Sequence, residues 1–292
     1  MSLTTPMKPL HPNVSLRKAR STILHLLLAR PSSVPFTLSN ISTFMSSASG
    51  LDKSLMIIQY PAKIAVALLV ALAAKLAKEN VGKGVFMGGF PALRSRAALY
   101  AVRLKALSSS IGDARTMMRL LGIIPVLASV PSLLSSASSL DPTFHLINIL
   151  QTASLILYYP LENLSYLSSK GVFPLSPARE LNWSTWSCRF WAAYVALDVW
   201  RLARQRKQMQ AKERAIRARS QSVEKEDVEA DVRALRAEKI GWIEEAVVNV
   251  GYAPLTIHWS LPNGAWSNEA WTGVFGTIAC LAGIRAKWRN MS

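Results

Sequence analysis

The residues of this chain with the clearest chemistry are the cations between Leu93 and Leu107, in the stretch LRSRAALYAVRLKAL. At about 100° per residue, a helix here would gather large apolar side chains on one face and place cations on its flanks and back. The apolar face comprises Leu93, Ala97, Tyr100, Leu104 and Leu107, and the cations are Arg94, Arg96, Arg103 and Lys105. The stretch contains no acid, so its chemistry suits anionic groups beside an apolar phase, as at the surface of an anionic bilayer.

The energies of such a helix favour attachment to lipid. Burial of a Leu or Tyr side chain contributes about 1.5–3 kcal/mol, and each Lys or Arg near an anionic surface adds about 1 kcal/mol. Four large apolar residues and four cations could therefore hold a helix of this kind on a bilayer. The alternative is a helix that packs on a protein core and exposes a solvated basic face.

Residues that could support catalysis or bind a metal occur without the spacing that either requires. The four histidines form no metal-binding pattern, and the chain has neither a glycine-rich phosphate loop nor a nucleophile elbow. Cys188 and Cys280 are far apart in apolar surroundings, which favours two buried thiols over a disulfide framework or a zinc site. The sequence therefore predicts a protein that is not an enzyme and needs no cofactor or metal.

Composition narrows the class of partner. The chain has 292 residues, a formal net charge of +17, and 50% hydrophobic residues. Proteins that bind nucleic acids combine positive charge with a hydrophilic surface, whereas high charge with high hydrophobicity is typical of membrane proteins with basic flanks. We therefore expect anionic membrane lipids as a partner and no nucleic acid.

Several apolar segments follow one another, and none has the features of a simple membrane span. Ile64–Ala74 lies between two lysines and is too short to cross a bilayer. The other segments contain prolines, polar residues or an arginine, or are short; they are Leu120–Leu140, Pro142–Leu161, Leu181–Leu197 and Ala270–Ile284. The pattern predicts an all-α fold, a membrane-associated helical bundle with amphipathic interfacial helices and a small number of transmembrane helices.

The last apolar segment has a stripe of small residues. Small residues at helical spacing let two helices approach closely in lipid, so we interpret the stripe as a helix–helix contact face formed by Gly273, Gly276, Ala279, Cys280 and Gly283. The flanking tryptophans resemble interfacial anchors; they are Trp259, Trp266, Trp271 and Trp288. A basic tail, Arg285, Lys287 and Arg289, closes the segment.

Composition shifts divide the chain into five regions. We expect a flexible basic N-terminal arm over 1–49, an amphipathic helical membrane-binding region over 50–119, an apolar helical region with candidate spans over 120–200, a charged helix or disordered loop over 201–240, and a C-terminal membrane helix with a basic tail over 241–292. The arm resembles a mitochondrial presequence in composition, through Arg17, Lys18, Arg20 and Arg30.

Short blocks in a fixed order carry a resemblance to a known family. The blocks are Gly50–Tyr60 (GLDKSLMIIQY), Asp113–Leu120 with its two arginines, Tyr158–Leu167 (YYPLENLSYL), and an aromatic helix over Trp183–Trp200. In this order, and followed by a Gly-containing apolar helix, they resemble the peroxin-11 family, the peroxisomal membrane elongation and division proteins. Departures at Ser54 and Leu121 favour the divergent gamma or C-type branch.

The resemblance implies a peroxisomal membrane protein whose amphipathic helix inserts into the cytosolic leaflet and promotes elongation, proliferation and fission. It also implies self-association, here through the C-terminal helices, and recruitment of a fission receptor and a dynamin-like GTPase. Carried onto this chain, the membrane-binding residues are Leu93, Arg94, Arg96, Tyr100, Arg103, Leu104 and Lys105, supported by Arg115 and Arg119.

Two alternatives remain open at this point. A channel or transporter for small metabolites would bury polar side chains between spans, and the candidates are His145, Asn148, Gln151 and Glu162. A mitochondrial membrane assembly factor is suggested only by the composition of the N-terminal arm.

Overall fold

The computed structural model describes residues 37–82, 90–136, 141–219 and 225–291. This part of the chain is helical and contains no strand, which confirms the predicted all-α class. The presequence-like cations before residue 31 lie outside the described residues. The helices are α2 (Leu38–Met45), α3 (Ala48–Gly82), α4 (Phe90–Met118), α5 (Ile123–Ser135), α6 (Pro142–Ser169), α7 (Pro177–Arg219), α8 (Lys225–Trp259) and α9 (Glu269–Arg289).

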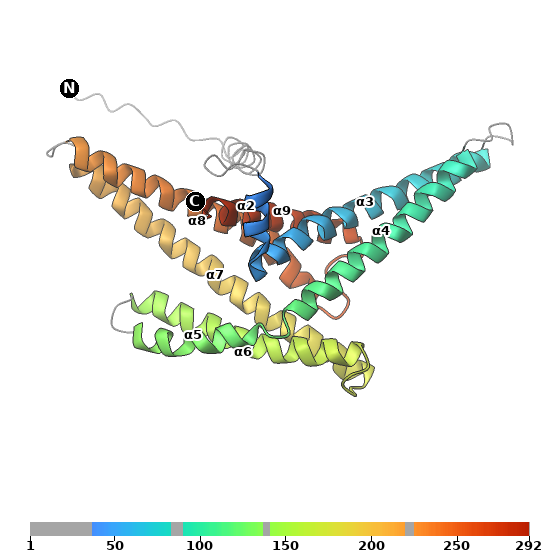
Figure 1. The fold of residues 1–292 in the computed structure, drawn as a ribbon, viewed down its shortest axis with the longest axis horizontal. Helices are drawn as coiled ribbons and strands as arrows, with labels where there is room; N and C mark the ends of the chain where they lie inside the picture. The colour runs from blue at the N-terminus through green and yellow to red at the C-terminus, as the bar shows by residue number, and fades with distance from the viewer. Residues whose placement is uncertain (1–36, 83–89, 137–140, 220–224, 292) are drawn as a thin grey trace, which may run out of the picture.

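Two long antiparallel hairpins, α3–α4 and α7–α8, diverge like the arms of a V (Figure 1). Helix α9 lies between them and packs against both α3 and α8. Helix α6 packs along the first half of α7, and α5 folds back on α6. The centre of the molecule is therefore the place where α3, α8 and α9 meet.

The core at this centre is small. Met56, Tyr60 and Cys280 are buried there, and partly buried residues such as Tyr252 pack around them. A Cβ on Gly276 would come within 2.4 Å of the Tyr60 ring, so only glycine permits this approach of α9 to α3. The close contact of α9 with its neighbours follows from its small residues.

The predicted small-residue stripe of α9 forms contacts within the chain. Gly273, Gly276 and Gly283 face α3, and a Cβ on Gly251 of α8 would meet Ala279 at 2.7 Å. Cys280 is fully buried, and its thiol donates to the Lys53 carbonyl. The stripe is thus a helix–helix contact face, and in this structure it contacts α3 and α8 of the same chain.

The tryptophans around α9 also differ from the expected interfacial anchors. Trp288 is buried and lies 5.6 Å from the Phe44 ring, measured between centroids. Trp259 stacks on Trp191, and Trp266 stacks on His258. Of the four tryptophans, only Trp271 is exposed. The others fill space between helices, because the hairpins bring aromatic residues of α7, α8 and α2 against them.

The charged region after residue 200 is a helical hairpin. Helices α7 and α8 run antiparallel, with ion pairs between them at Lys212–Glu238, Lys239–Glu213 and Arg219–Asp231. The region therefore takes the helical form of the two predicted alternatives, apart from residues 220–224, which lie outside the described part. These pairs are solvent-exposed, so each contributes little to stability and their main effect is to fix register.

Part of the predicted N-terminal arm is helical. Residues 38–45 form α2, whose N-terminus is capped by Thr37, because its hydroxyl accepts the Asn40 N–H. Phe44 in α2 is buried against Trp288. Ordered helix is therefore present within the range 1–49 that the composition assigned to a flexible arm.

Helix α3 is long and apolar enough to cross a membrane over Ala48–Ala77. The sequence pattern argues against a span here because Lys63 limits the uncharged run, but the helix continues through Lys63, which pairs with Glu269 of α9. Leu93–Met118 and Ile123–Ser135 together would make a second span, bent by 42°. Within the described part of residues 120–200, no helix qualifies alone, and Ile123–Ser135 qualifies only together with Leu93–Met118.

Candidate membrane-binding site

Helix α4 contacts α3 through a narrow stripe. Ala97, Ala101, Ser108, Ile111 and Arg115 are buried, and their spacing of three, four and seven residues places them on one face. The first members are small, which lets the two backbones lie close together. Most of the described side chains from Leu93 to Leu107 are therefore exposed.

The structure divides the predicted apolar face. Ala97 faces α3 and Leu104 is partly buried, whereas Leu93, Tyr100 and Leu107 are 48%, 54% and 46% exposed. The small members of the face contact α3, and most of the large ones remain on the surface.

A second apolar strip on α4 was missed in the sequence. Leu99, Val102 and Ala106 lie on the side of the helix opposite α3, and the first two are 47% and 67% exposed. We call these three residues the outer strip. Their spacing of three and four residues was the available signal, but the flanking leucines gave a stronger one on the other face.

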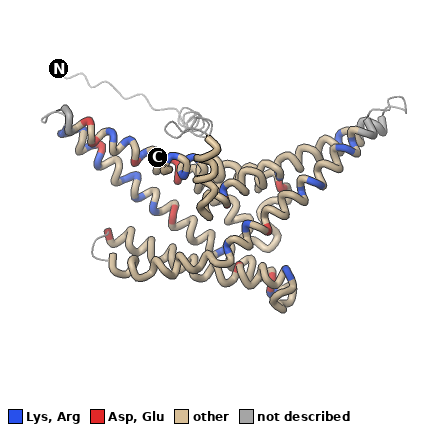
Figure 2. Tube along the Cα trace, viewed as in Figure 1, with Lys and Arg blue, Asp and Glu red and all other residues tan. Residues whose placement is uncertain are grey.

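Four exposed cations flank the outer strip. At 100° per residue, Arg96 and Arg103 lie on one side of it, and Arg94 and Lys105 lie on the other. Figure 2 shows the cations following α4, while the adjoining length of α3 carries almost no charge. On α3 the apolar side chains of Leu68 and Val70 are also exposed, at 66% and 54%. The α3–α4 arm thus combines apolar surface with one row of cations on each side of the outer strip.

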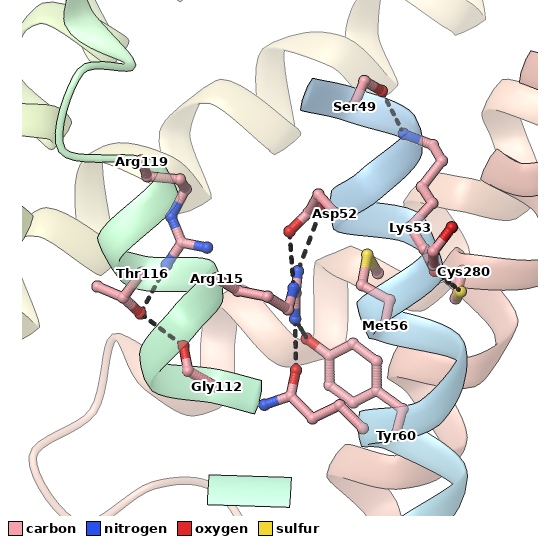
Figure 3. Close-up of polar contacts among 12 residues, drawn as sticks. Ser49, Asp52, Lys53, Met56, Tyr60, Gly112, Arg115, Thr116, Arg119 and Cys280 are labelled. Atoms are coloured by element: carbon pink, nitrogen blue, oxygen red, sulfur yellow. Dashed lines mark hydrogen bonds and ion pairs between the residues drawn. The ribbon is translucent and has the colours of Figure 1, made fainter. Parts of the chain in front are cut away.

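Arg115 does not belong to this exposed surface. Its Nε donates to Asp52 Oδ1 at 2.7 Å, and its Nη1 donates to Gln59 Oε1 at 2.6 Å (Figure 3). The guanidinium also lies over the Tyr60 ring, 5.5 Å from its centroid. Arg115 is 8% exposed and fixes α4 to α3.

Arg119 joins the end of α4 to α6. Its Nη2 and Nε donate to the two carboxylate oxygens of Glu162, at 2.6 and 3.0 Å. Asn163 of α6 donates its side-chain amide to the Leu120 carbonyl at 2.9 Å. The placement of Arg115 and Arg119 corrects the expectation that they add to the lipid-binding cations, because carboxylates already neutralise both.

The sequence blocks that carried the family resemblance meet in this cluster. Asp52, Gln59 and Tyr60 come from the first block, Arg115 and Arg119 from the second, and Glu162 and Asn163 from the third. The blocks therefore build the junction that holds the α3–α4 arm to the rest of the molecule.

Two of the polar residues proposed for a channel are engaged in helix packing. Glu162 pairs with Arg119, and Gln151 donates to Asp198 Oδ1 at 3.2 Å. Asp198 also accepts from Asn249 of α8 at 2.7 Å. His145 and Asn148 are partly buried on α6. Gln151 and Glu162 thus stabilise contacts between helices.

Comparison with known proteins places this arrangement in a family. No solved structure matches the chain. An uncharacterized protein of Schizosaccharomyces pombe is 24% identical over 128 residues, which is 44% of this chain and 52% of that protein. The chain thus matches about half the length of this curated relative.

The family model of peroxisomal biogenesis factor 11 (PEX11) matches residues 93–288, from the start of the cationic stretch to the end of α9. The match includes the outer strip, its flanking cations and both arginines of the buried cluster. Because it covers well over half of the chain, the protein belongs to the PEX11 family and is a protein of the peroxisomal membrane.

Proposed function

We propose that this protein bends and elongates the peroxisomal membrane by inserting its α3–α4 arm into one leaflet. The family gives the coarser statement, a non-enzymatic peroxisomal membrane protein that takes part in peroxisome proliferation. The observation that carries the finer proposal is the outer strip of α4, exposed and flanked by four cations.

The physical mechanism is a wedge. Leu99 and Val102 enter the boundary between headgroups and acyl chains, while the cations on both flanks contact anionic lipid phosphates. An inserted helix expands the leaflet that it enters relative to the opposite leaflet, and the bilayer bends toward the protein. Many copies add their small contributions along a tubule.

The buried cluster makes the wedge effective. Arg115 ties α4 to α3, and Arg119 ties the end of α4 to α6. Because the arm is held at its base, insertion at its exposed face orients the whole molecule on the membrane.

The test compares variants of the full-length chain on vesicles that contain anionic lipid. Leu99→Glu with Val102→Glu should abolish tubulation seen by electron microscopy and should shorten peroxisomes in cells. Transfer of each apolar side chain from water into lipid contributes about 1.5–3 kcal/mol. Each substitution replaces that side chain with a carboxylate, which prefers water.

The matched control is Val232→Glu with Val172→Glu, two residues with similar exposure, 48% and 69%, that belong to neither α3 nor α4. It should tubulate vesicles as the unmodified protein does. If the outer-strip variant also tubulates normally, or if the control fails to the same extent, the wedge is not the mechanism.

Self-association and recruitment of the fission receptor and a dynamin-like GTPase belong to the same proposal, as steps that follow bending. Because the α9 stripe is covered within the chain, contacts between copies would use other surfaces. Cross-linking in membranes with thiol- and amine-reactive reagents, followed by mass spectrometry, should find links between copies on exposed helices and none at Cys280, the buried thiol of the stripe.

A further inference from the structure

A pocket of about 430 Å³ lies between α3, α8 and α9, apart from the outer strip. Its volume is within the usual range for sites that hold a small molecule. One part of the lining is apolar and includes Met56, Val248 and Ala279. The other part is polar and comprises Ser49, Lys53, Lys287 and Asn290. The pocket therefore suits a molecule with an anionic head and an apolar body.

The two lysines reach this pocket from different helices. Lys53 projects from α3 away from Asp52, and its ammonium donates to the Ser49 hydroxyl at 2.9 Å (Figure 3). Lys287 extends from α9 over the Phe44 ring, 5.9 Å from its centroid. Among the described residues, neither lysine is within ion-pair distance of a carboxylate, and no Asp or Glu lines the pocket.

Other cations near the pocket, unlike Lys53 and Lys287, form ion pairs. Arg285 and Arg289, two residues on either side of Lys287, both pair with the buried Glu244 of α8. Lys63, further along α3, pairs with Glu269. Two cations that share a pocket without an acid repel each other, and an anion placed between them removes that repulsion.

We propose that this pocket binds the phosphate group of a phospholipid headgroup between Lys53 and Lys287. Phosphate accepts charge-assisted hydrogen bonds from ammonium and hydroxyl donors, and the apolar lining continues toward Tyr252 for the first part of an acyl chain. Ser49 and Lys53 lie near the start of α3, at the base of the arm that the proposed function places among lipid headgroups, and the inference rests on that function.

The experiment measures how fast each lysine of the full-length, detergent-purified chain is methylated, by peptide mass spectrometry. The probes are monomeric short-chain phosphatidic acid, the matching diacylglycerol without phosphate, and inorganic phosphate. Phosphatidic acid at about nine times its Kd should slow methylation of both lysines about tenfold. Lys170 and Lys212, which are exposed and outside the pocket, report non-specific effects.

Inorganic phosphate separates the two sources of the anion. Protection by phosphatidic acid alone supports a site that needs the acyl chain as well, and protection by both supports a site that recognises phosphate itself. Equal protection by diacylglycerol, or protection of neither lysine by phosphatidic acid, overturns the proposal.

A substitution at Lys287 provides a second test of the proposal. Lys287→Gln removes one cation from a partly exposed position and should weaken binding of phosphatidic acid about tenfold, as expected for loss of one charge-assisted hydrogen bond. Lys170→Gln, the control, should bind as the unmodified chain does. An unchanged affinity in Lys287→Gln contradicts a site built on the two lysines.

Discussion

Arg115 illustrates how single residues set the architecture. A buried guanidinium is costly unless its donors are satisfied, and here Asp52, Gln59 and Tyr60 satisfy them from one helix. The side chain of Arg115 thus converts a thin contact of small residues into a fixed junction. All four residues belong to the first two family blocks, so the sequence pointed to them. The sequence predicted Arg115 at a lipid surface, whereas it is buried between helices.

Replacement of Arg115 by Leu should destabilise the fold by about 2–4 kcal/mol, because it leaves Asp52 and Gln59 without their partner in a mostly buried place. The measurement is denaturant unfolding in detergent, followed by tryptophan fluorescence. Arg94→Leu, at an exposed position of the same helix, should change stability little. Equal effects of the two substitutions would show that the contacts of Arg115 contribute no more to the free energy of unfolding than an exposed arginine does.

For the helices, residue periodicity predicted the secondary structure better than it predicted what each helix contacts. The stretch around residue 100 is a helix with exposed cations, as expected, but its rotation about its axis differs because small residues, not leucines, face α3. The stripe on α9 was identified by residue spacing, yet spacing cannot tell a neighbour in the same chain from one in another copy. Helix α3 was misjudged because Glu269, far away in sequence, pairs with Lys63.

Two glycine substitutions test the packing of α9. Gly276→Ala should lower the thermal midpoint, because the new Cβ would come within 2.4 Å of the Tyr60 ring, and overpacking of this kind costs about 1–3 kcal/mol. Gly241→Ala in α8 meets only the tip of Arg289 at 3.5 Å and should be neutral or raise the midpoint by the helix propensity of Ala. Midpoints that rise in both variants would mean that α9 does not pack on α3 as described.

The turn between α8 and α9 should respond to pH through His258. Its Nδ1 accepts the Ala265 N–H at 2.8 Å, and its ring stacks on Trp266. Burial lowers the pKa of His258 below its ordinary value near 6.5, so the folded turn prefers the neutral ring. The stabilisation is therefore complete above pH 6.5 and decreases as the pH falls from 6.5 toward the lowered pKa.

Hydrogen exchange at the Ala265 amide measures this response. After correction for the intrinsic exchange rate, protection should be lower at pH 5.5 than at pH 7.5, and the difference should vanish in His258→Gln. Equal protection at the two pH values in the unmodified chain would contradict a role for the neutral imidazole.

At the scale of the whole molecule, the two arms differ in surface chemistry. The α7–α8 arm carries cations and acids that pair across the hairpin, whereas the α3–α4 arm carries cations along α4 beside exposed apolar residues (Figure 2). Helix α9 sets the angle between the arms because it packs on one helix of each. One arm therefore suits water and the other suits an anionic lipid surface.

Salt should weaken binding to anionic vesicles without abolishing it. The screening length falls from about 10 Å at 0.1 M salt to about 3 Å at 1 M, so flotation assays should show at least about tenfold weaker binding at the higher concentration. The apolar contribution of the outer strip remains. In Arg96→Glu with Arg103→Glu the salt dependence should be clearly smaller, whereas Arg214→Glu with Arg236→Glu, the same change of charge on the other arm, should leave it unchanged. An identical salt response in all three proteins would argue against lipid contact by α4.

The contact of Phe44 with Trp288 has a consequence for work on intact cells. Phe44 precedes the region that the family model matches, and Trp288 is the last residue within it. A deletion that begins the chain at residue 47 uncovers an indole and undermines the end of α9, so mislocalisation of such a protein would report damage to the fold instead of loss of an address. Deletions that map targeting information should therefore stop before Thr37.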